Sequence, residues 1–246
     1  MLDQSLPATL AISSSANGLA LDRSERTQAV ADALILTYGP RAWRRHLPPV
    51  DELVATILSQ HTSDANTDRA YASLRTRFPT WQHVINAPVA DIADTIRSGG
   101  LANQKAPRIQ AVLSSVREQY GGFNLDSLAS KSVQAARDQL SSLHGVGPKT
   151  ASCVLLFSLG MPALPVDTHV HRVTRRIALI DDRTTAEAAH EALEAQLDGD
   201  RDRIYAFHMH LIHHGRTICT ARRPHCERCS LTDLCDYARN SNVDFA

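Results

Sequence analysis

The stretch LHGVGPKTAS, residues 143–152, interrupts one helical segment and begins the next. Gly145 and Gly147 can both adopt a positive φ angle, so a tight turn can present successive backbone N–H groups on one side. Pro148 favours the first position of a new helix. Such a turn at a helix start binds phosphate without a charged side chain, whereas the alternative is that the glycines only let two helices cross closely. Of the two interpretations, we favour the phosphate-binding turn.

Lys149 follows this break and falls in the first turn of the new helix, where the helix dipole is unfavourable for a cation. A lysine there either reaches a phosphate or acts as a neutral amine nucleophile, which needs a partner that removes a proton or steadies positive charge. Asp167 begins the segment VDTHVHRV, residues 166–173, and is the candidate partner, with a helix cap as its simpler role. The pattern therefore indicates an amine and a carboxylate next to a phosphate-binding turn.

Most of the remaining chain has the apolar spacing of helices separated by short turns. The expected helical segments are residues 24–38, 50–60, 63–78, 89–101, 105–123, 132–143, 150–160 and 166–180. Gly39 and Pro40 end the first segment, and Gly160 ends the apolar segment 150–160. We find no alternating strand pattern and no fixed repeat, so we predict an all-α fold. Residues 1–23 lack clear periodicity, and we expect a poorly ordered tail there.

The composition is that of a globular chain, with 246 residues, 43% apolar content and a formal net charge of zero. No run of about 18 apolar residues occurs, and no basic segment precedes an apolar stretch at the start. We therefore expect no membrane association and no export signal. The charge is uneven, because residues 201–226 contain five arginines and one acid, which indicates either a nucleic-acid surface or a solvated polar face.

Four of the five cysteines follow the spacing C-x6-C-x2-C-x5-C near the end of the chain. They are Cys219, Cys226, Cys229 and Cys235. Four thiolates on one short loop can bind zinc or a [4Fe-4S] cluster, and the spacing favours the cluster because structural zinc sites usually carry two CxxC-like pairs. Arg222 and Arg223 lie between the first two cysteines, on a rigid basic loop that suits a phosphate backbone. Cys153, in an apolar segment, is expected to be a small buried side chain.

Three motifs in order resemble the endonuclease III family of helix-hairpin-helix DNA glycosylases: LHGVGPKTA, VDTHVHRV, and HHGRTIC leading into the four-cysteine spacing. The resemblance covers residues 24–236. It implies that Lys149 attacks C1′ of a damaged nucleoside, displaces the base and forms a Schiff base that leads to β-elimination. It implies that Asp167 assists the attack and stabilises positive charge on the sugar.

The same resemblance implies the binding groups. The four cysteines would hold a [4Fe-4S] cluster, and the cluster loop would present Arg222 and Arg223 to DNA. The backbone of Gly145 and Gly147 would hold the phosphate next to the lesion. The expected partner is therefore damaged double-stranded DNA.

Two turns match family positions that handle the space left by a flipped base, which cannot be attacked inside the stack. In GGLANQKA, residues 99–106, Leu101 matches a wedge. In ILSQHTSD, residues 57–64, the gap-filling position is occupied by His61, whereas the best-known members carry Gln at that position. Gln60 directly precedes His61. Either residue could fill the gap, so recognition of the opposing base is expected to differ from those members.

The family fold consists of two helical domains with DNA across the cleft between them. It implies a six-helix barrel with the helix-hairpin-helix over residues 43–160. A discontinuous iron–sulfur cluster domain would comprise residues 24–42 and 161–246. We expect a monomer in the cytoplasm, associated with the nucleoid, in a reducing compartment.

The expected activity is that of a bifunctional DNA glycosylase and abasic-site lyase that removes oxidised pyrimidines from duplex DNA. One alternative is a monofunctional mismatch DNA glycosylase of the same fold, against which Lys149 weighs. The other is a non-catalytic helix-hairpin-helix DNA-binding module, against which the pair of Lys149 and Asp167 weighs. The histidines of HMHLIHHG, residues 208–215, are explained by helix packing without a metal ion.

Overall fold

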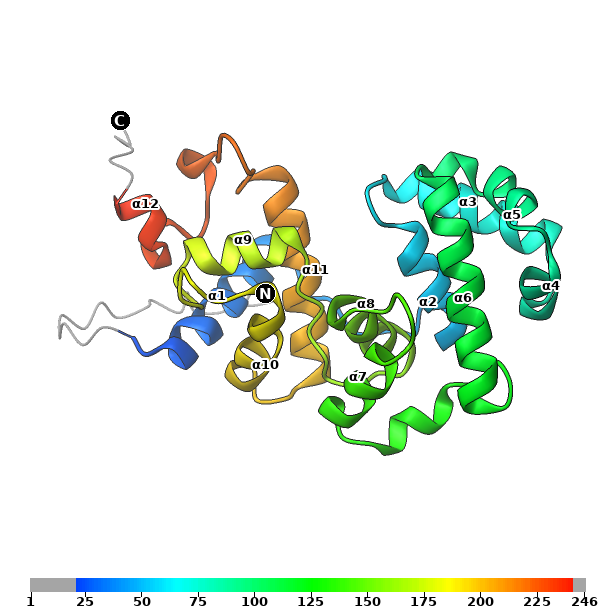
Figure 1. Ribbon diagram of the computed structural model, residues 1–246. Helices are drawn as coiled ribbons and strands as arrows, with labels where there is room; N and C mark the ends of the chain where they lie inside the picture. Colours follow the sequence, from blue (N-terminus) through cyan, green and yellow to red (C-terminus); the bar gives the residue numbers. More distant parts are fainter. Residues whose placement is uncertain (1–20, 241–246) are drawn as a thin grey trace, which may run out of the picture.

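The computed structural model describes residues 21–240, and these residues contain helices and no strand (Figure 1). The predicted all-α class is confirmed. The helices are α1 (Arg23–Tyr38), α2 (Pro49–Leu58), α3 (Asp64–Arg77), α4 (Trp81–Asn86), α5 (Val89–Thr95), η1 (Arg97–Gly99), α6 (Ala102–Tyr120), η2 (Asp126–Ser130), α7 (Val133–Ser141), α8 (Pro148–Cys153), η3 (Val154–Ser158), α9 (Thr168–Arg176), α10 (Ala186–Gln196), α11 (Arg201–Thr217), η4 (Cys226–Arg228), η5 (Thr232–Leu234) and α12 (Asp236–Asn240).

The first helix begins slightly earlier than expected. Asp22 caps α1 by accepting a hydrogen bond from the backbone N–H of Glu25, whose side chain accepts from the backbone of Asp22 in return. Gly39 ends the helix with a φ of 83°. The poorly ordered tail that we predicted for residues 1–23 falls mostly on residues 1–20, which lie outside the described residues.

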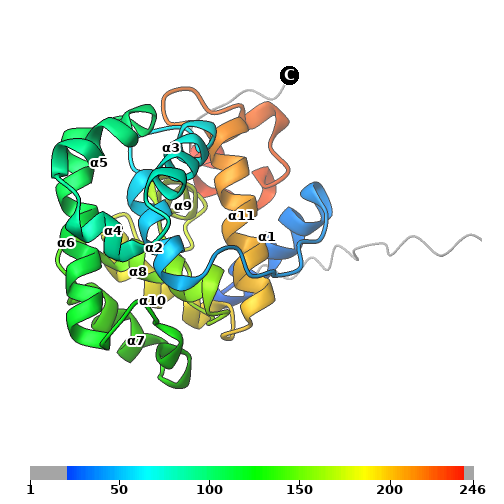
Figure 2. The same cartoon turned by 90° about the vertical axis from the view of Figure 1, so that its right-hand side faces the viewer.

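Two groups of helices make up the described chain, and each encloses its own buried apolar cluster (Figures 1 and 2). The first group contains α2 to α8. The second brings α1 back against α10 and α11, next to α9 and the cysteine-containing loop. Arg26 of α1 fixes this return by an ion pair with Asp236 (NH1 to Oδ1, 3.0 Å). The exact limits of the two predicted domains, 43–160 and 24–42 with 161–246, stay a prediction.

The apolar segment 150–160 is not the single α-helix that we predicted. Helix α8 ends at Cys153 and continues as a π-helical turn, η3. This segment lies between the two groups of helices, so Val154 and Leu155 join the first apolar cluster and Cys153, Leu156 and Phe157 join the second. An apolar run gives no sign of this change in helix type, because π-turns are rare and have no distinct apolar spacing.

None of the helices within residues 21–240 is long and apolar enough to cross a membrane.

Candidate active site and cysteine centre

The hairpin between α7 and α8 uses its two glycines differently. Gly145 has a φ of 82°, and a Cβ there would lie 2.9 Å from Nε of Arg108, so the position needs glycine for two reasons. Gly147 has a φ of −97°, which corrects the expectation of positive φ at both glycines. The reason is that Gly147 precedes Pro148, and a residue before proline favours extended backbone. A Cβ at Gly147 would meet nothing within 4 Å, so the backbone there is open to approach.

Lys149 lies in the first turn of α8, as predicted, among acidic and thiol side chains. Its pKa is raised, first by Cys153 one helical turn further along α8 and also by the carboxylates of Asp167 and Glu52, while burial opposes the rise. Burial raises the pKa of Cys153 itself, while the charge of Lys149 acts in the opposite direction. Lys149 is therefore an ammonium at rest and must lose a proton before it can attack an electrophile.

Asp167 caps α9 and also acts on Lys149. Its Oδ1 accepts hydrogen bonds from the backbone N–H groups of His169 and Val170, both at 2.8 Å. The same carboxylate is close enough to Lys149 to raise the pKa of the lysine. The cap and the partner role that the sequence offered as alternatives are thus compatible in one side chain, because the cap occupies only one of the two oxygens.

Glu52 is an acidic side chain near Lys149 that sequence reasoning missed. It lies on α2, which packs against α8, and is only 8% exposed. Burial raises its pKa to about 7, although the charge of Lys149 and a hydrogen bond with Thr56 act in the opposite direction. The available signal was an acid between the apolar residues Val50 and Leu53 on a buried helix.

Two buried histidines hold the loop that leads to Asp167. His208 of α11 contacts the carbonyl oxygen of Pro165 through Nδ1 at 2.9 Å, and His190 of α10 contacts that of Leu164 through Nδ1 at 2.7 Å. Since a carbonyl oxygen only accepts, both rings carry their proton on Nδ1. Burial lowers the pKa of each ring to about 4, so both are neutral and add no positive charge beside Lys149.

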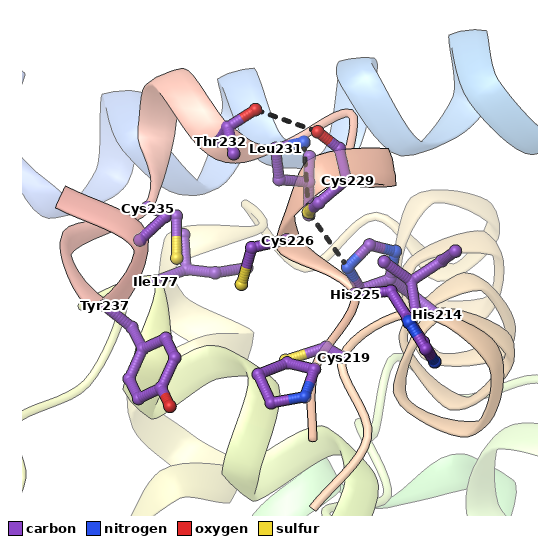
Figure 3. Close-up of a pocket in the computed structure, with 13 residues that line it drawn as sticks. Ile177, His214, Cys219, His225, Cys226, Cys229, Leu231, Thr232, Cys235 and Tyr237 are labelled. Atoms are coloured by element: carbon purple, nitrogen blue, oxygen red, sulfur yellow. Dashed lines mark hydrogen bonds between the residues drawn. The ribbon is translucent and has the colours of Figure 1, made fainter. Parts of the chain in front are cut away.

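The four carboxy-terminal cysteines surround one space between α9, α11 and the final turns (Figure 3). None of the four forms a disulfide bond, and Cys226 and Cys235 are less than a tenth exposed. Burial raises the pKa of Cys229 to about 11, so a thiolate there requires a positively charged centre. Within residues 21–240, no three His, Cys, Asp or Glu side chains approach closely enough to share a single ion. Four cysteines around one space match the one thiolate for each iron that a [4Fe-4S] cube needs.

Arg176 of α9 holds the cysteine loop and was not predicted. Its NH1 donates to Sγ of Cys219 at 3.3 Å and to the carbonyl oxygen of Thr220 at 2.8 Å, and its NH2 donates to that of Ala221 at 2.9 Å. The next residues, Arg222 and Arg223, are exposed. Arg176 therefore holds the start of the cysteine loop, and the loop carries two exposed arginines that can contact a phosphate backbone.

The two turns that we assigned to the flipped-base space share an unusual backbone. His61 has a φ of 54° and Leu101 has a φ of 50°, in a region that non-glycine residues rarely adopt. Both side chains are exposed, and Leu101 is 46% accessible, which is high for a leucine. Gln60 is oriented inward, since its Oε1 accepts a hydrogen bond from NH1 of Arg108 at 2.9 Å.

The fold and the hairpin define a class of protein. Residues 54–197 match the HhH-GPD superfamily of base excision DNA repair proteins. Residues 219–235 match the iron–sulfur binding domain of endonuclease III, and this range begins and ends at the outer two of the four cysteines. The chain belongs to the endonuclease III family.

Curated relatives agree with this assignment. Endonuclease III of Thermotoga maritima is 37% identical over 191 residues, which cover 78% of this chain and 84% of that protein. Endonuclease III of Bacillus subtilis is 32% identical over 190 residues, covering 77% and 82%. A putative DNA glycosylase of Arabidopsis thaliana, At3g47830, is 42% identical over 131 residues. That match covers 53% of this chain and 45% of the plant protein, less than half of its length.

Solved structures show the same fold. A non-covalent endonuclease III–DNA complex superposes with a TM-score of 0.77 at 28% identity, covering 90% of this chain and 99% of that chain. A trapped endonuclease III–DNA covalent intermediate gives 0.75 at 27% identity with the same coverage. The predicted family, the class of enzyme (a DNA glycosylase and abasic-site lyase) and the iron–sulfur cofactor are confirmed. The roles of individual residues stay predictions.

Proposed function

We propose that this protein removes oxidised pyrimidines from duplex DNA and then cleaves the abasic site through a Schiff base on Lys149. The amine attacks C1′, the damaged base leaves, and the resulting Schiff base permits β-elimination of the 3′ phosphate. The observation that carries the proposal is that the carboxylate of Asp167 raises the pKa of Lys149, which lies in the first turn of the helix after the glycine hairpin. A module that only bound DNA would have no need of a paired amine and carboxylate.

We further propose how the duplex is held. The open backbone at Gly147 and the turn at Gly145 receive the phosphate next to the lesion. The exposed Arg222 and Arg223 contact the backbone elsewhere, and Leu101 enters the stack as the wedge. The unusual backbone at Leu101 supports this role, because strain of this kind is found at functional sites.

The four cysteines would hold the [4Fe-4S] cluster, which supplies a rigid centre for the basic loop when it is bound. A reducing compartment suits this assignment, because four cysteines serve as cluster ligands and not as disulfide partners. We propose a monomer in the cytoplasm, associated with the nucleoid, whose partner is damaged double-stranded DNA. The oxidised-pyrimidine preference follows from the similarity to endonuclease III, and the monofunctional mismatch enzyme is the alternative.

Borohydride trapping tests the nucleophile. Wild type incubated with abasic-site duplex and borohydride should give a covalent adduct, and Lys149→Ala should abolish the adduct while duplex binding is retained. Lys131→Ala removes an exposed lysine and serves as the matched control. An adduct with Lys149→Ala, or none with active wild type, would contradict the proposal.

Substrate preference requires its own assay. Excision rates are compared on duplexes that carry thymine glycol, a G·T mismatch, or adenine opposite 8-oxoguanine. Faster release of the oxidised pyrimidine is expected. Release from a mismatch only, without strand cleavage, would favour the monofunctional alternative.

A further inference from the structure

The first two turns of α6 contact three segments that the proposed function assigns to DNA. Lys105 is 3% exposed, and its Nζ donates to the carbonyl oxygen of Leu58 at 2.6 Å and to that of Gly99 at 2.7 Å. Leu58 is the last residue of α2, and Gly99 is the last residue of η1. One buried ammonium thus joins the helix ends that precede the two strained turns.

Arg108 lies one turn further along α6 and makes the third connection. Its Nε donates to the carbonyl oxygen of Gly145 at 2.8 Å, and its NH2 contacts the same oxygen. Its NH1 donates to Oε1 of Gln60 at 2.9 Å. A single guanidinium therefore links the hairpin between α7 and α8 to the turn that follows α2. Its planar fork fixes the direction of both contacts.

Gln60 and His61 have different surroundings as a result. Gln60 is partly buried and uses its amide oxygen toward Arg108, whereas His61 is exposed. The positive φ at His61 turns its side chain away from the line of α2, and such a conformation persists only where the neighbouring structure holds it. The hydrogen bond from Arg108 to Gln60, the residue before His61, helps to keep this backbone conformation in place.

We propose that Arg108 is a positioning residue that couples the hairpin to the turn carrying His61, with Gln60 as its anchor and His61 as the side chain that enters the gap. This inference rests on the proposed function, because it names the residue that replaces the flipped base. The insertion of His61 into the gap and the binding of the phosphate at the hairpin are then linked through Arg108. The opposing base is contacted by an imidazole and not by an amide.

A duplex with 2-aminopurine opposite a tetrahydrofuran abasic analogue reports this insertion, since 2-aminopurine brightens when it leaves the stack. In Gln60→Leu the ratio of unstacked to stacked 2-aminopurine should fall about tenfold, the effect of losing one hydrogen bond to a charged group. Gln60→Glu keeps an acceptor for Arg108 and should retain the wild-type ratio. His61→Ala should lower the ratio as Gln60→Leu does. All measurements use saturating protein, with binding verified by anisotropy.

Arg117→Met is the matched control, because Arg117 also lies on α6 and donates to a glutamine, Gln82, at 3.3 Å. It should behave as wild type, whereas Arg108→Met should lower the ratio at least as much as Gln60→Leu. The inference is overturned if Gln60→Leu or His61→Ala leaves the ratio of unstacked to stacked 2-aminopurine unchanged. It is also overturned if Gln60→Glu or Arg117→Met lowers this ratio as much as Gln60→Leu does. The tetrahydrofuran site cannot form a Schiff base, so failure of the Lys149 proposal in the trapping assay would be seen separately.

Discussion

Replacing Glu52 by glutamine is expected to change how the stability of the protein depends on pH. Burial raises the pKa of this carboxyl from 4.5 to about 7 in the folded chain, against the opposing effects of Lys149 and Thr56. Because one pH unit corresponds to about 1.4 kcal/mol, a charged Glu52 costs the folded protein about 3 kcal/mol. The carboxyl of Glu52 thus has a higher pKa in the folded state than in the unfolded state. Stability from this group is therefore present below pH 4.5 and is lost as the pH rises through about 7.

Urea unfolding of the holoprotein measures this effect. Between about pH 5 and about pH 8.5, the free energy of unfolding of Glu52→Gln should rise relative to wild type by about 2.5 kcal/mol, because the variant has no proton to lose. Glu187→Gln makes the same substitution at an exposed position of α10 and should follow the wild-type profile. Parallel profiles for wild type and Glu52→Gln would refute the argument, since Glu52 would then be charged in the fold at no cost.

Three further predictions concern the site. Asp167→Asn should keep the melting temperature, because asparagine also caps helices, but should slow base removal by at least about a hundredfold, as expected for loss of an acid–base partner; unchanged turnover would leave Asp167 as a cap only. Arg222→Ala should lower the slope of log affinity against log salt by about 1, since one phosphate contact is lost, and an unaltered slope would remove it from the interface. Purified protein should contain iron and acid-labile sulfide in equal amounts, about four each per chain, and stoichiometric zinc would overturn the assignment.

Local signals predicted some helix ends correctly, because caps and stops depend on neighbouring residues only, whereas other ends, such as those of the expected segments 89–101 and 105–123, lie elsewhere. The cap at Asp167, the proline that begins α8 and the glycine that ends α1 all lie where the sequence indicated. The short helix α4 and the helix α10 were not predicted. Helix α10 is rich in alanine and glutamate, which favour helices, so its sequence carried a local signal that the apolar spacing alone did not show. The brief α4 has little apolar periodicity and depends on the helices around it.

The residues that support the site were harder to predict. Arg108 and Arg176 each contact carbonyl groups more than thirty residues away in the chain, and surface arginines have the same local pattern. Glu52 carried a weak signal as an acid on a buried face, but its proximity to Lys149 depends on how α2 meets α8. Motif spacing yields candidates for the chemistry, whereas the groups that hold them depend on tertiary packing.

The return of α1 to the second group of helices has a consequence during synthesis. Val30 and Leu34 of α1 leave the ribosome long before their partners in α10 and α11, a wait on the order of ten seconds at ordinary translation rates. The helices of the first group are made in that interval and can collapse on their own apolar cluster. The four cysteines are made after the whole first group of helices, so a [4Fe-4S] cluster would bind only once those helices have been synthesised.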